Sequence, residues 1–182
     1  MKKLLSCNEI MKKMLYLIGF MGVGKTTIGQ RLAKQHSLNF IDTDKEIEKL
    51  TNKSITNIFE QYSESHFRNL ETKTLNHLKG NVIVACGGGL PIYNNNMNII
   101  KRSGISIYLK ASEDEIFMRL SKSLKKRPLI ADGSTKNVKK NIIKKTLSER
   151  ERFYAMADYI IDTNNASETD VLRKINSLPI FI

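Results

Sequence analysis

The segment Gly-Phe-Met-Gly-Val-Gly-Lys-Thr at residues 19–26 matches the pattern G-x-x-x-x-G-K-[ST] in full. It follows the apolar run of residues 14–18, and a helical pattern begins at Lys25. A strand that passes through a glycine-rich turn into a helix points backbone N–H groups at bound phosphate. The sequence therefore predicts a P-loop in which the Lys25 ammonium faces the β- and γ-phosphates and the Thr26 hydroxyl ligates Mg²⁺. A turn that only joins a strand to a helix is the alternative.

Short β-rich runs alternate with longer helical patterns along the chain, which is typical of a parallel sheet built from βαβ units. We expect strands at residues 14–18, 39–43, 82–86, 105–109 and 159–162. We expect helices at residues 25–36, 46–50, 54–78 (one or two, with a break near Ser63), 94–103, 112–120, 138–156 and from residue 167. The length of 182 residues and the absence of repeats predict one domain over residues 1–182.

The formal net charge of +12 is compatible with nucleic acid, an anionic membrane surface or anionic small molecules as partners. Most basic residues are lysines scattered among many Asn and Ile residues, which is typical of a compositional bias. No basic stretch is interleaved with the aromatic residues that stack on bases. We therefore expect small anions as partners, and neither a nucleic acid nor a membrane.

The cysteine content and the N-terminus indicate the compartment. Two cysteines, Cys7 and Cys86, are too few for a disulfide framework or a metal cluster. The basic start resembles a signal sequence, but polar residues interrupt any apolar region, and no later run is long enough to span a membrane. We expect a cytoplasmic monomer, with residues 1–13 as a disordered extension and Met11 or Met14 as alternative starts.

Two carboxylates, Asp42 and Asp44, end the expected strand at residues 39–43. Side chains two apart on a strand share a face, so both carboxylates are expected at the edge of the parallel sheet where ligands bind. One carboxylate would lie near Mg²⁺, and the other would accept a hydrogen bond from a substrate hydroxyl that loses its proton. The alternative is that Asp44 only caps the helix that follows.

Three glycines, Gly87, Gly88 and Gly89, directly follow the apolar run of residues 82–86. Glycines let backbone N–H groups approach a ligand without interference from side chains. At the edge of a sheet that also carries a P-loop, this segment is a candidate wall of the ligand site.

Three arginines, Arg68, Arg127 and Arg150, stand out in a chain whose basic residues are mostly lysine. Arginine suits bidentate binding of carboxylates and stabilisation of phosphoryl charge. Glu71 lies one helical turn after Arg68 and can orient its guanidinium group. Arg127 lies in residues 122–136, a basic stretch without periodicity that is expected to form a mobile loop. A surface salt bridge is the alternative for each arginine.

Taken together, these motifs resemble the shikimate kinase family. The order and approximate spacing match over residues 14–165, through GFMGVGKTTIG, FIDTD, FR..E at residues 67–71, ACGGG, RPLI and R...Y at residues 150–154. The resemblance implies a P-loop kinase fold, a three-layer α/β/α arrangement of a five-stranded parallel sheet in the order 2-3-1-4-5. It also implies substrate-binding helices at about residues 44–78 and a lid at about residues 122–136 that closes over ATP.

The resemblance further implies Mg²⁺-dependent transfer of the γ-phosphate of ATP to the 3-hydroxyl of shikimate, in aromatic amino acid biosynthesis. The implied ATP contacts are Gly22, Val23, Gly24, Lys25, Thr26, Thr27, Arg119 beside adenine, and Arg127 on the lid. The implied metal ligands are Thr26 and, through water, Asp42. The implied catalytic residues are Asp44, which holds ring hydroxyls, Lys25 and Arg127. The implied contacts of the substrate carboxylate are Arg68, Arg150 and the backbone of Gly87, Gly88 and Gly89.

The sequence departs from the family at three places. Ser63 stands where Gly is common, the first ten residues and residues 178–182 have no counterpart, and the lid is rich in lysine, which predicts salt-dependent ATP affinity. Two alternatives stay open. One is another small-metabolite P-loop kinase, such as a gluconate kinase, and the other is a nucleotide- or nucleic-acid-binding module without metabolite kinase activity.

Overall fold

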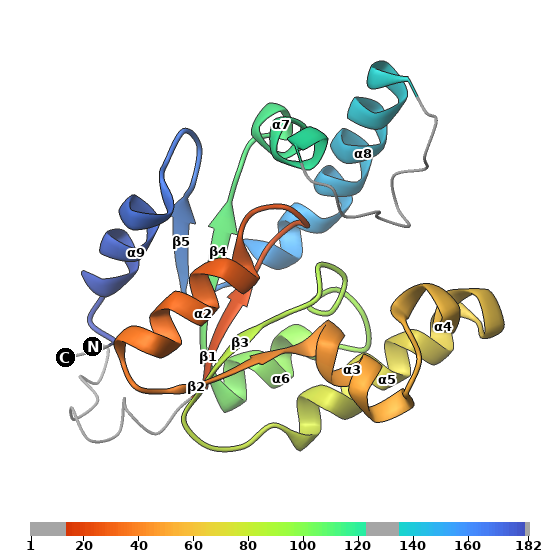
Figure 1. Ribbon diagram of the computed structural model, residues 1–182, viewed down its shortest axis with the longest axis horizontal. Helices are drawn as coiled ribbons and strands as arrows, with labels where there is room; N and C mark the ends of the chain where they lie inside the picture. Colours follow the sequence, from red (N-terminus) through yellow and green to blue (C-terminus); the bar gives the residue numbers. More distant parts are fainter. Residues whose placement is uncertain (1–13, 123–134, 181–182) are drawn as a thin grey trace.

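A five-stranded parallel sheet with the strand order β2-β3-β1-β4-β5 forms the centre of the computed structural model, which describes residues 14–122 and 135–180 (Figure 1). The strands are β1 (Met14–Ile18), β2 (Asn39–Asp42), β3 (Val82–Ala85), β4 (Gly104–Lys110) and β5 (Tyr159–Asp162). All four pairings between neighbouring strands are parallel. The predicted sheet and its strand order are confirmed.

Eight helices accompany the sheet in the described part of the chain. They are α2 (Lys25–Gln35), α3 (Thr43–Thr51), α4 (Ile55–Gln61), α5 (Glu64–His77), α6 (Asn96–Ser103), α7 (Glu113–Lys122), α8 (Lys136–Tyr154) and α9 (Glu168–Asn176). The stretch expected to hold one or two helices, residues 54–78, holds two. Ser54 starts α4 and Ser63 starts α5, because the side chain of each serine accepts a hydrogen bond from a backbone N–H in the first turn of its helix.

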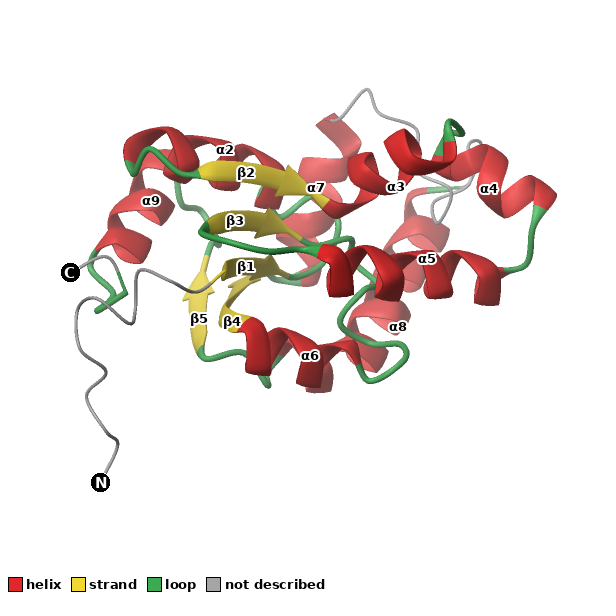
Figure 2. Ribbon diagram, turned by 90° about the horizontal axis from the view of Figure 1, so that it is seen from below, coloured by secondary structure: helices red, strands yellow, loops and turns green. Residues whose placement is uncertain are grey.

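The helices cover both faces of the sheet. Tyr16 and Leu17 are neighbours on β1, so their side chains point to opposite faces. Gly29 of α2 lies against Leu17 on one face, whereas the Tyr16 hydroxyl lies 2.9 Å from Ser103 Oγ at the end of α6 on the other. Beside α2 lies α9 (Figure 2). The three-layer α/β/α prediction is therefore confirmed.

Two groups of buried side chains hold the molecule together. The main core is built around β1, where Tyr16, Leu17 and Ile18 are fully buried, as expected for a strand covered on both faces. A smaller cluster of Ile47, Ile58 and Phe67 joins α3, α4 and α5 into a lobe beside the sheet. This lobe coincides with the segment that the family resemblance assigns to the substrate.

Leu178 and Ile180 pack against the main core, so this part of the C-terminal tail belongs to the fold. The expected extension at residues 1–13 lies outside the described residues, and so do residues 123–134 of the expected lid, with Arg127. Among the helices that are described, none combines the length and apolar character needed to cross a bilayer.

Candidate active site

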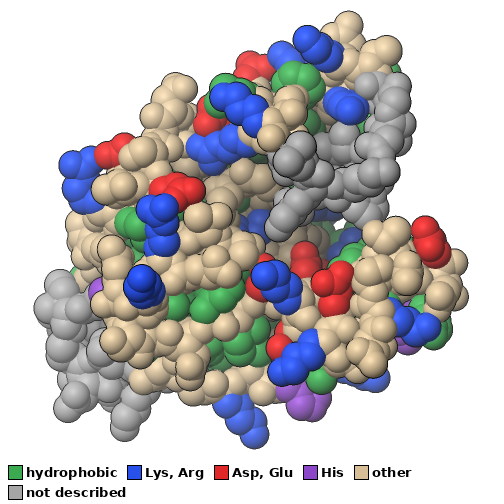
Figure 3. Space-filling model, in the orientation of Figure 1, with side chains coloured by type: hydrophobic (Ala, Val, Ile, Leu, Met, Phe, Trp, Pro, Cys, Tyr) green, Lys and Arg blue, Asp and Glu red, His purple; other side chains and the backbone are tan. Residues whose placement is uncertain are grey.

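The predicted site residues that the structure describes gather at one edge of the sheet. Because β1, β2 and β3 run parallel, the P-loop after Ile18, Asp42 at the end of β2 and the glycines after β3 meet there (Figure 1). Two pockets open at this edge, with volumes of about 300 and 470 Å³. They share Met21, Asp44, Gly87 and Gly88. In the space-filling view, charged side chains surround a hollow between the α3–α5 lobe and the body of the molecule (Figure 3).

The P-loop forms the floor of the smaller pocket. Gly19, Gly22 and Gly24 have φ angles of 139°, 83° and 96°, a region that side-chain-bearing residues rarely adopt, so the turn requires glycine. The Lys25 ammonium donates hydrogen bonds of 2.8 Å to the carbonyls of Gly19 and Phe20, which hold it over the turn. Gly22, Gly24, Lys25, Thr26, Thr27 and Arg119 line this pocket, as predicted for ATP contacts. Val23 does not, because its side chain is buried in the core, and Arg127 lies outside the described residues.

Asp42 joins the P-loop to α3. Its Oδ2 accepts a 2.7 Å hydrogen bond from the Thr26 hydroxyl, and its Oδ1 accepts bonds from the backbone N–H groups of Asp44 and Lys45. Asp42 is therefore the residue that caps α3, and Asp44 lies in the first turn of the helix. The expectation that both carboxylates share a strand face was wrong, because the strand ends at Asp42, yet both line the same pocket.

The donor set at Thr26 and Asp42 fits Mg²⁺. A hydroxyl and a carboxylate are hard oxygen ligands, and magnesium in kinases binds through one or two protein groups together with phosphate oxygens. Residues 14–122 and 135–180 contain no cluster of three or more His, Cys, Asp or Glu side chains that would hold a metal by themselves. A shared protein and phosphate site is the arrangement that this donor set supports.

Two carboxylates, Asp44 and Glu71, converge on Gly87. A Cβ atom built on Gly87 would overlap Asp44 Oδ1 and would lie 3.2 Å from Glu71 Oε1. Glu71 is only 1% exposed, and this burial raises the pKa of its carboxyl group to about 7, although the neighbouring Arg68 favours the charged form.

The guanidinium group of Arg68 has partners on several sides. Nη1 donates to Glu71 Oε2 at 2.8 Å, while Nε and Nη2 both donate to Glu64 Oε1, at 3.1 and 2.8 Å. The ring centroid of Tyr93 lies 4.1 Å from Cζ. Burial alone would lower the pKa of Arg68, but the contacts with Glu71 and Glu64 raise it, so the group stays charged.

The predicted contact between Arg68 and Glu71 is confirmed. Sequence reasoning missed Glu64, although its position four residues before Arg68 on a helix was a usable signal. It also missed Tyr93, which lies on a loop and carries no periodic signal.

Arg150 reaches the same pocket from α8. It is 8% exposed, and its Cζ lies 5.7 Å from the ring centroid of Phe20. Its Nη1 lies 3.5 Å from the place that a Cβ of Gly88 would take. Arg68 and Arg150 thus face the glycine segment from two different helices, as expected of a carboxylate site.

Arg119 of α7 links the P-loop to the segment after β5. Its Nη2 donates to the Thr163 carbonyl at 2.5 Å, its Nη1 lies 3.4 Å from the Val23 carbonyl, and its Nε pairs with Glu115 at 2.7 Å. Arg119 lines the P-loop pocket, and its contact with adenine stays a prediction from the family resemblance. Arg127 cannot be placed beside it, since it lies outside the described residues.

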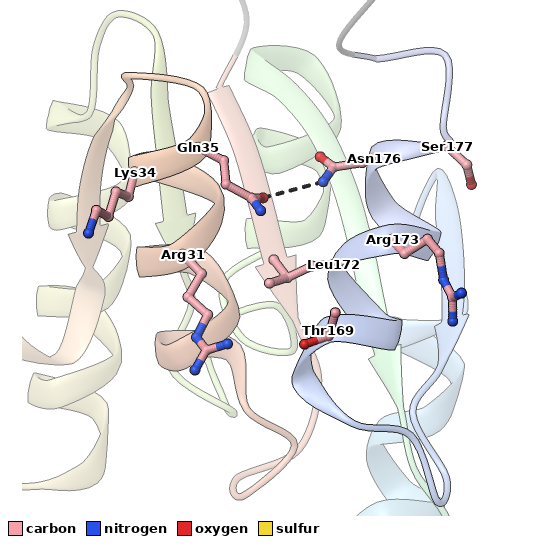
Figure 4. A pocket seen from close by; sticks show the side chains of 8 residues that line it. All are labelled: Arg31, Lys34, Gln35, Thr169, Leu172, Arg173, Asn176 and Ser177. Carbon is pink, nitrogen blue, oxygen red and sulfur yellow. Dashed lines mark hydrogen bonds between the residues drawn. The ribbon is translucent and has the colours of Figure 1, made fainter.

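A separate groove of about 630 Å³ lies between α2 and α9 (Figure 4). Its basic side chains include Arg31, which pairs with Glu168 at 2.8 Å, and Arg173, which pairs with Asp170. None of the predicted site residues lines it. The predicted chemistry therefore belongs to the sheet edge.

The family model described as shikimate kinase matches residues 21–178. A shikimate kinase of Caldanaerobacter subterraneus subsp. tengcongensis is 40% identical over 166 residues, which make up 90% of this chain and 94% of that protein. The crystal structure of a shikimate kinase from Bacteroides thetaiotaomicron has a TM-score of 0.85 and 29% identity, covering 91% of this chain and 97% of that chain. A shikimate kinase from Acinetobacter baumannii in complex with shikimate has a TM-score of 0.83 and 33% identity, covering 93% and 94%. Sequence and fold thus agree over nearly the whole length, and the chain belongs to the shikimate kinase family.

Proposed function

We propose that this chain transfers the γ-phosphate of ATP to the 3-hydroxyl of shikimate and releases ADP and shikimate 3-phosphate, a step of aromatic amino acid biosynthesis. The observation that carries the proposal is the shared wall of the two pockets. Asp44 lies in both, with the P-loop on one side and Arg68 and Arg150 on the other. The structure of the A. baumannii relative is a complex with shikimate, which supports shikimate as the acceptor.

The smaller pocket is assigned to ATP. The backbone N–H groups of the P-loop cradle its phosphates, and the Lys25 ammonium neutralises charge at the β- and γ-phosphates. Thr26 and Asp42 would hold Mg²⁺, which supplies neutralisation of charge on the phosphate oxygens. Arg119 is assigned to the adenine end of the pocket.

Asp44 is assigned to the acceptor hydroxyl. Its carboxylate accepts the hydrogen bond of that hydroxyl and takes its proton while the oxygen bonds to the γ-phosphorus and the bond to the leaving ADP oxygen breaks. Most of the acceleration then comes from positioning and from charge stabilisation, as is general for phosphoryl transfer.

The carboxylate of the acceptor is assigned to Arg68 and Arg150, together with the glycine segment. Two of the Arg68 donors, Nε and Nη2, face Glu64, whose side chain is 57% exposed. Because Glu64 is on the solvent side of this pair, a substrate carboxylate that enters the pocket can replace it at this face of the guanidinium.

Four further assignments rest on the sequence and stay predictions. They are a single kinase domain, a monomer, a cytoplasmic location, and a lid whose Arg127 stabilises the transferred phosphoryl group. Closure of such a lid would exclude water and protect ATP from hydrolysis.

The test is an ADP-release assay with shikimate, gluconate, other hydroxy acids or RNA added, with and without Mg²⁺. Shikimate should raise ATP turnover by orders of magnitude over the others.

Asp44→Asn should lower this turnover by about a hundredfold or more, because proton transfer and orientation are lost, and should leave ATP affinity nearly unchanged. Asp114→Asn, on the exposed side of α7, is the matched control. Equal turnover with gluconate would contradict the proposal, and a main effect of Asp44→Asn on ATP affinity would contradict the role of Asp44.

A further inference from the structure

We propose that Tyr154 is a positioning residue of the acceptor site, which fixes the Gly88–Gly89 peptide so that an amide N–H faces the substrate carboxylate. The inference rests on the proposed function and deepens it. The Tyr154 hydroxyl donates a 2.6 Å hydrogen bond to the carbonyl oxygen of Gly88. Tyr154 ends α8, one helical turn after Arg150.

Because the peptide bond is planar, this contact also fixes the direction of the N–H group in the same peptide. In a trans peptide the carbonyl of one residue and the N–H of the next point in opposite directions. With the Gly88 carbonyl held by Tyr154, the Gly89 N–H is directed away from Tyr154. Gly89 lines the acceptor pocket against the guanidinium group of Arg68.

The glycine segment has donors left for a ligand. The Gly87 N–H is used within the protein, because it donates to Thr43 Oγ1 at 2.8 Å. The N–H groups of Gly88 and Gly89 donate no hydrogen bond to any described residue. Gly88 and Gly89 line the same pocket as Arg68 and Arg150, so a carboxylate held by both arginines can accept from these backbone donors.

Tyr154 is rigid enough to hold the segment. Its side chain is fully buried, and its ring centroid lies 5.1 Å from that of Tyr108 on β4. Glu151, on the same turn of α8, accepts a 2.6 Å bond from the Tyr108 hydroxyl and pairs with Lys110 at 2.9 Å. Burial also raises the pKa of Tyr154 to about 12, so the hydroxyl keeps its proton throughout the pH range of a kinase assay.

Without conformational control, the glycine segment would be free to rotate its peptide planes, since glycine permits many backbone angles. The end of α8 therefore contributes twice to the same carboxylate site. Arg150 supplies a charged donor, and Tyr154, one turn later, sets the direction of a neutral donor, the Gly89 N–H.

The experiment compares Tyr154→Phe with Tyr16→Phe in the full chain. Tyr16 is the matched control because it is equally buried and its hydroxyl bonds to Ser103 at the end of α6, not to the glycine segment. Tyr154→Phe should raise the KM for shikimate about threefold to tenfold, the range expected for one hydrogen bond, with the KM for ATP within about twofold of wild type. Tyr16→Phe should lower the melting temperature without changing either KM.

The role of Tyr154 is overturned if the KM for shikimate is unchanged in Tyr154→Phe, or if it rises equally in Tyr16→Phe. Neither result contradicts the proposed function, which the wild-type activity tests. A wild-type chain that does not phosphorylate shikimate refutes the proposed function and this role with it. KM does not depend on the amount of folded enzyme, so a partly unfolded variant still gives a result. If Tyr154→Phe yields no folded protein, the Gly89 amide of the wild-type chain is followed by NMR. A downfield shift on addition of shikimate is expected, and an unchanged signal overturns the inference.

Discussion

Gly87 and Gly89 each leave room for a different functional side chain. A Cβ on Gly87 would overlap Asp44 Oδ1, and a Cβ on Gly89 would overlap Arg68 Nη1 and lie 3.0 Å from its Cζ. A methyl group at either position therefore displaces a side chain of the proposed site rather than backbone. The same substitution should have two different kinetic effects.

Gly87→Ala should lower kcat, because it moves the proposed acceptor base, and Gly89→Ala should raise the KM for shikimate, because it moves the carboxylate anchor. Each effect should be roughly tenfold to a hundredfold, the scale of a small misplacement in an active site. Steady-state kinetics with both substrates measure the split, and each variant is the control for the other. Identical changes in kcat and KM in both variants would contradict the separate roles of Asp44 and Arg68.

Glu71 makes the stability of the protein depend on pH. Burial raises its pKa from 4.5 to about 7 in the folded state, so between these values the folded chain holds a proton that the unfolded chain has released. The free energy of unfolding should therefore fall as the pH rises from about 4.5 to 7 and become level above that. Relative to Glu71→Gln, which does not titrate, the wild type should lose up to about 3 kcal/mol over this window. Urea denaturation at several pH values measures the difference, and a difference that stays constant or grows with pH would refute it.

At the scale of elements, the junction of β2 and α3 shows what the sequence could not resolve. The pattern of residues 39–43 predicts a strand, and Asp42 and Asp44 look alike in it. In the structure the Asp42 carboxylate accepts two backbone N–H groups, which starts α3 at Thr43 and places Asp44 in the helix. The Asp42 carboxylate is also held by the Thr26 hydroxyl of another element, and a local pattern does not contain that contact.

The elements with strong patterns were predicted well. The apolar runs of β1 and β3 are continuous because both faces of these strands are covered, and the P-loop and the triple glycine identify the ends of the same strands. The contact between Arg68 and Glu71 followed from helical spacing. By contrast, the bond from Tyr154 to Gly88 joins residues that are 66 positions apart and needs the three-dimensional structure.

Ser63 starts α5, the helix that carries Arg68 and Glu71. It has an extended backbone with φ −70° and ψ 159°, and its Oγ accepts a 3.3 Å bond from the His66 N–H. The departure from the glycine common in the family is therefore compatible with the turn, and serine contributes a cap. Ser63→Ala should lower the free energy of unfolding by about 1 kcal/mol, whereas Ser63→Gly should cost only a few tenths of that. Chemical denaturation compares the two variants, and a glycine variant that is no more stable than the alanine variant would argue against the cap.

On the scale of the whole molecule, the site is assembled from distant parts of the chain. Lys25 begins α2, Arg68 lies on α5 and Arg150 on α8, and only the parallel sheet brings them to one edge. Both proposed substrates are anions, and the chain carries a formal net charge of +12. The positive charge of the chain thus favours the binding of both substrates, because a positive field raises the local concentration of anionic ligands.

The two explanations of this charge, a field that attracts substrate and a compositional bias without function, predict different responses to salt. Between about 0.05 and 0.3 M KCl the screening length falls from above to below about 10 Å, which weakens attraction to scattered surface lysines. If the field acts on the substrates, the KM for ATP should rise about threefold or more over this range, and the KM for shikimate, which carries less charge, should rise less.

Sucrose at matched viscosity is the control, because it slows diffusion without screening charge. The double variant Lys144→Gln/Lys145→Gln, exposed on α8, should reduce the salt dependence while leaving kcat at low salt unchanged. A KM for ATP that is insensitive to salt would leave compositional bias as the explanation.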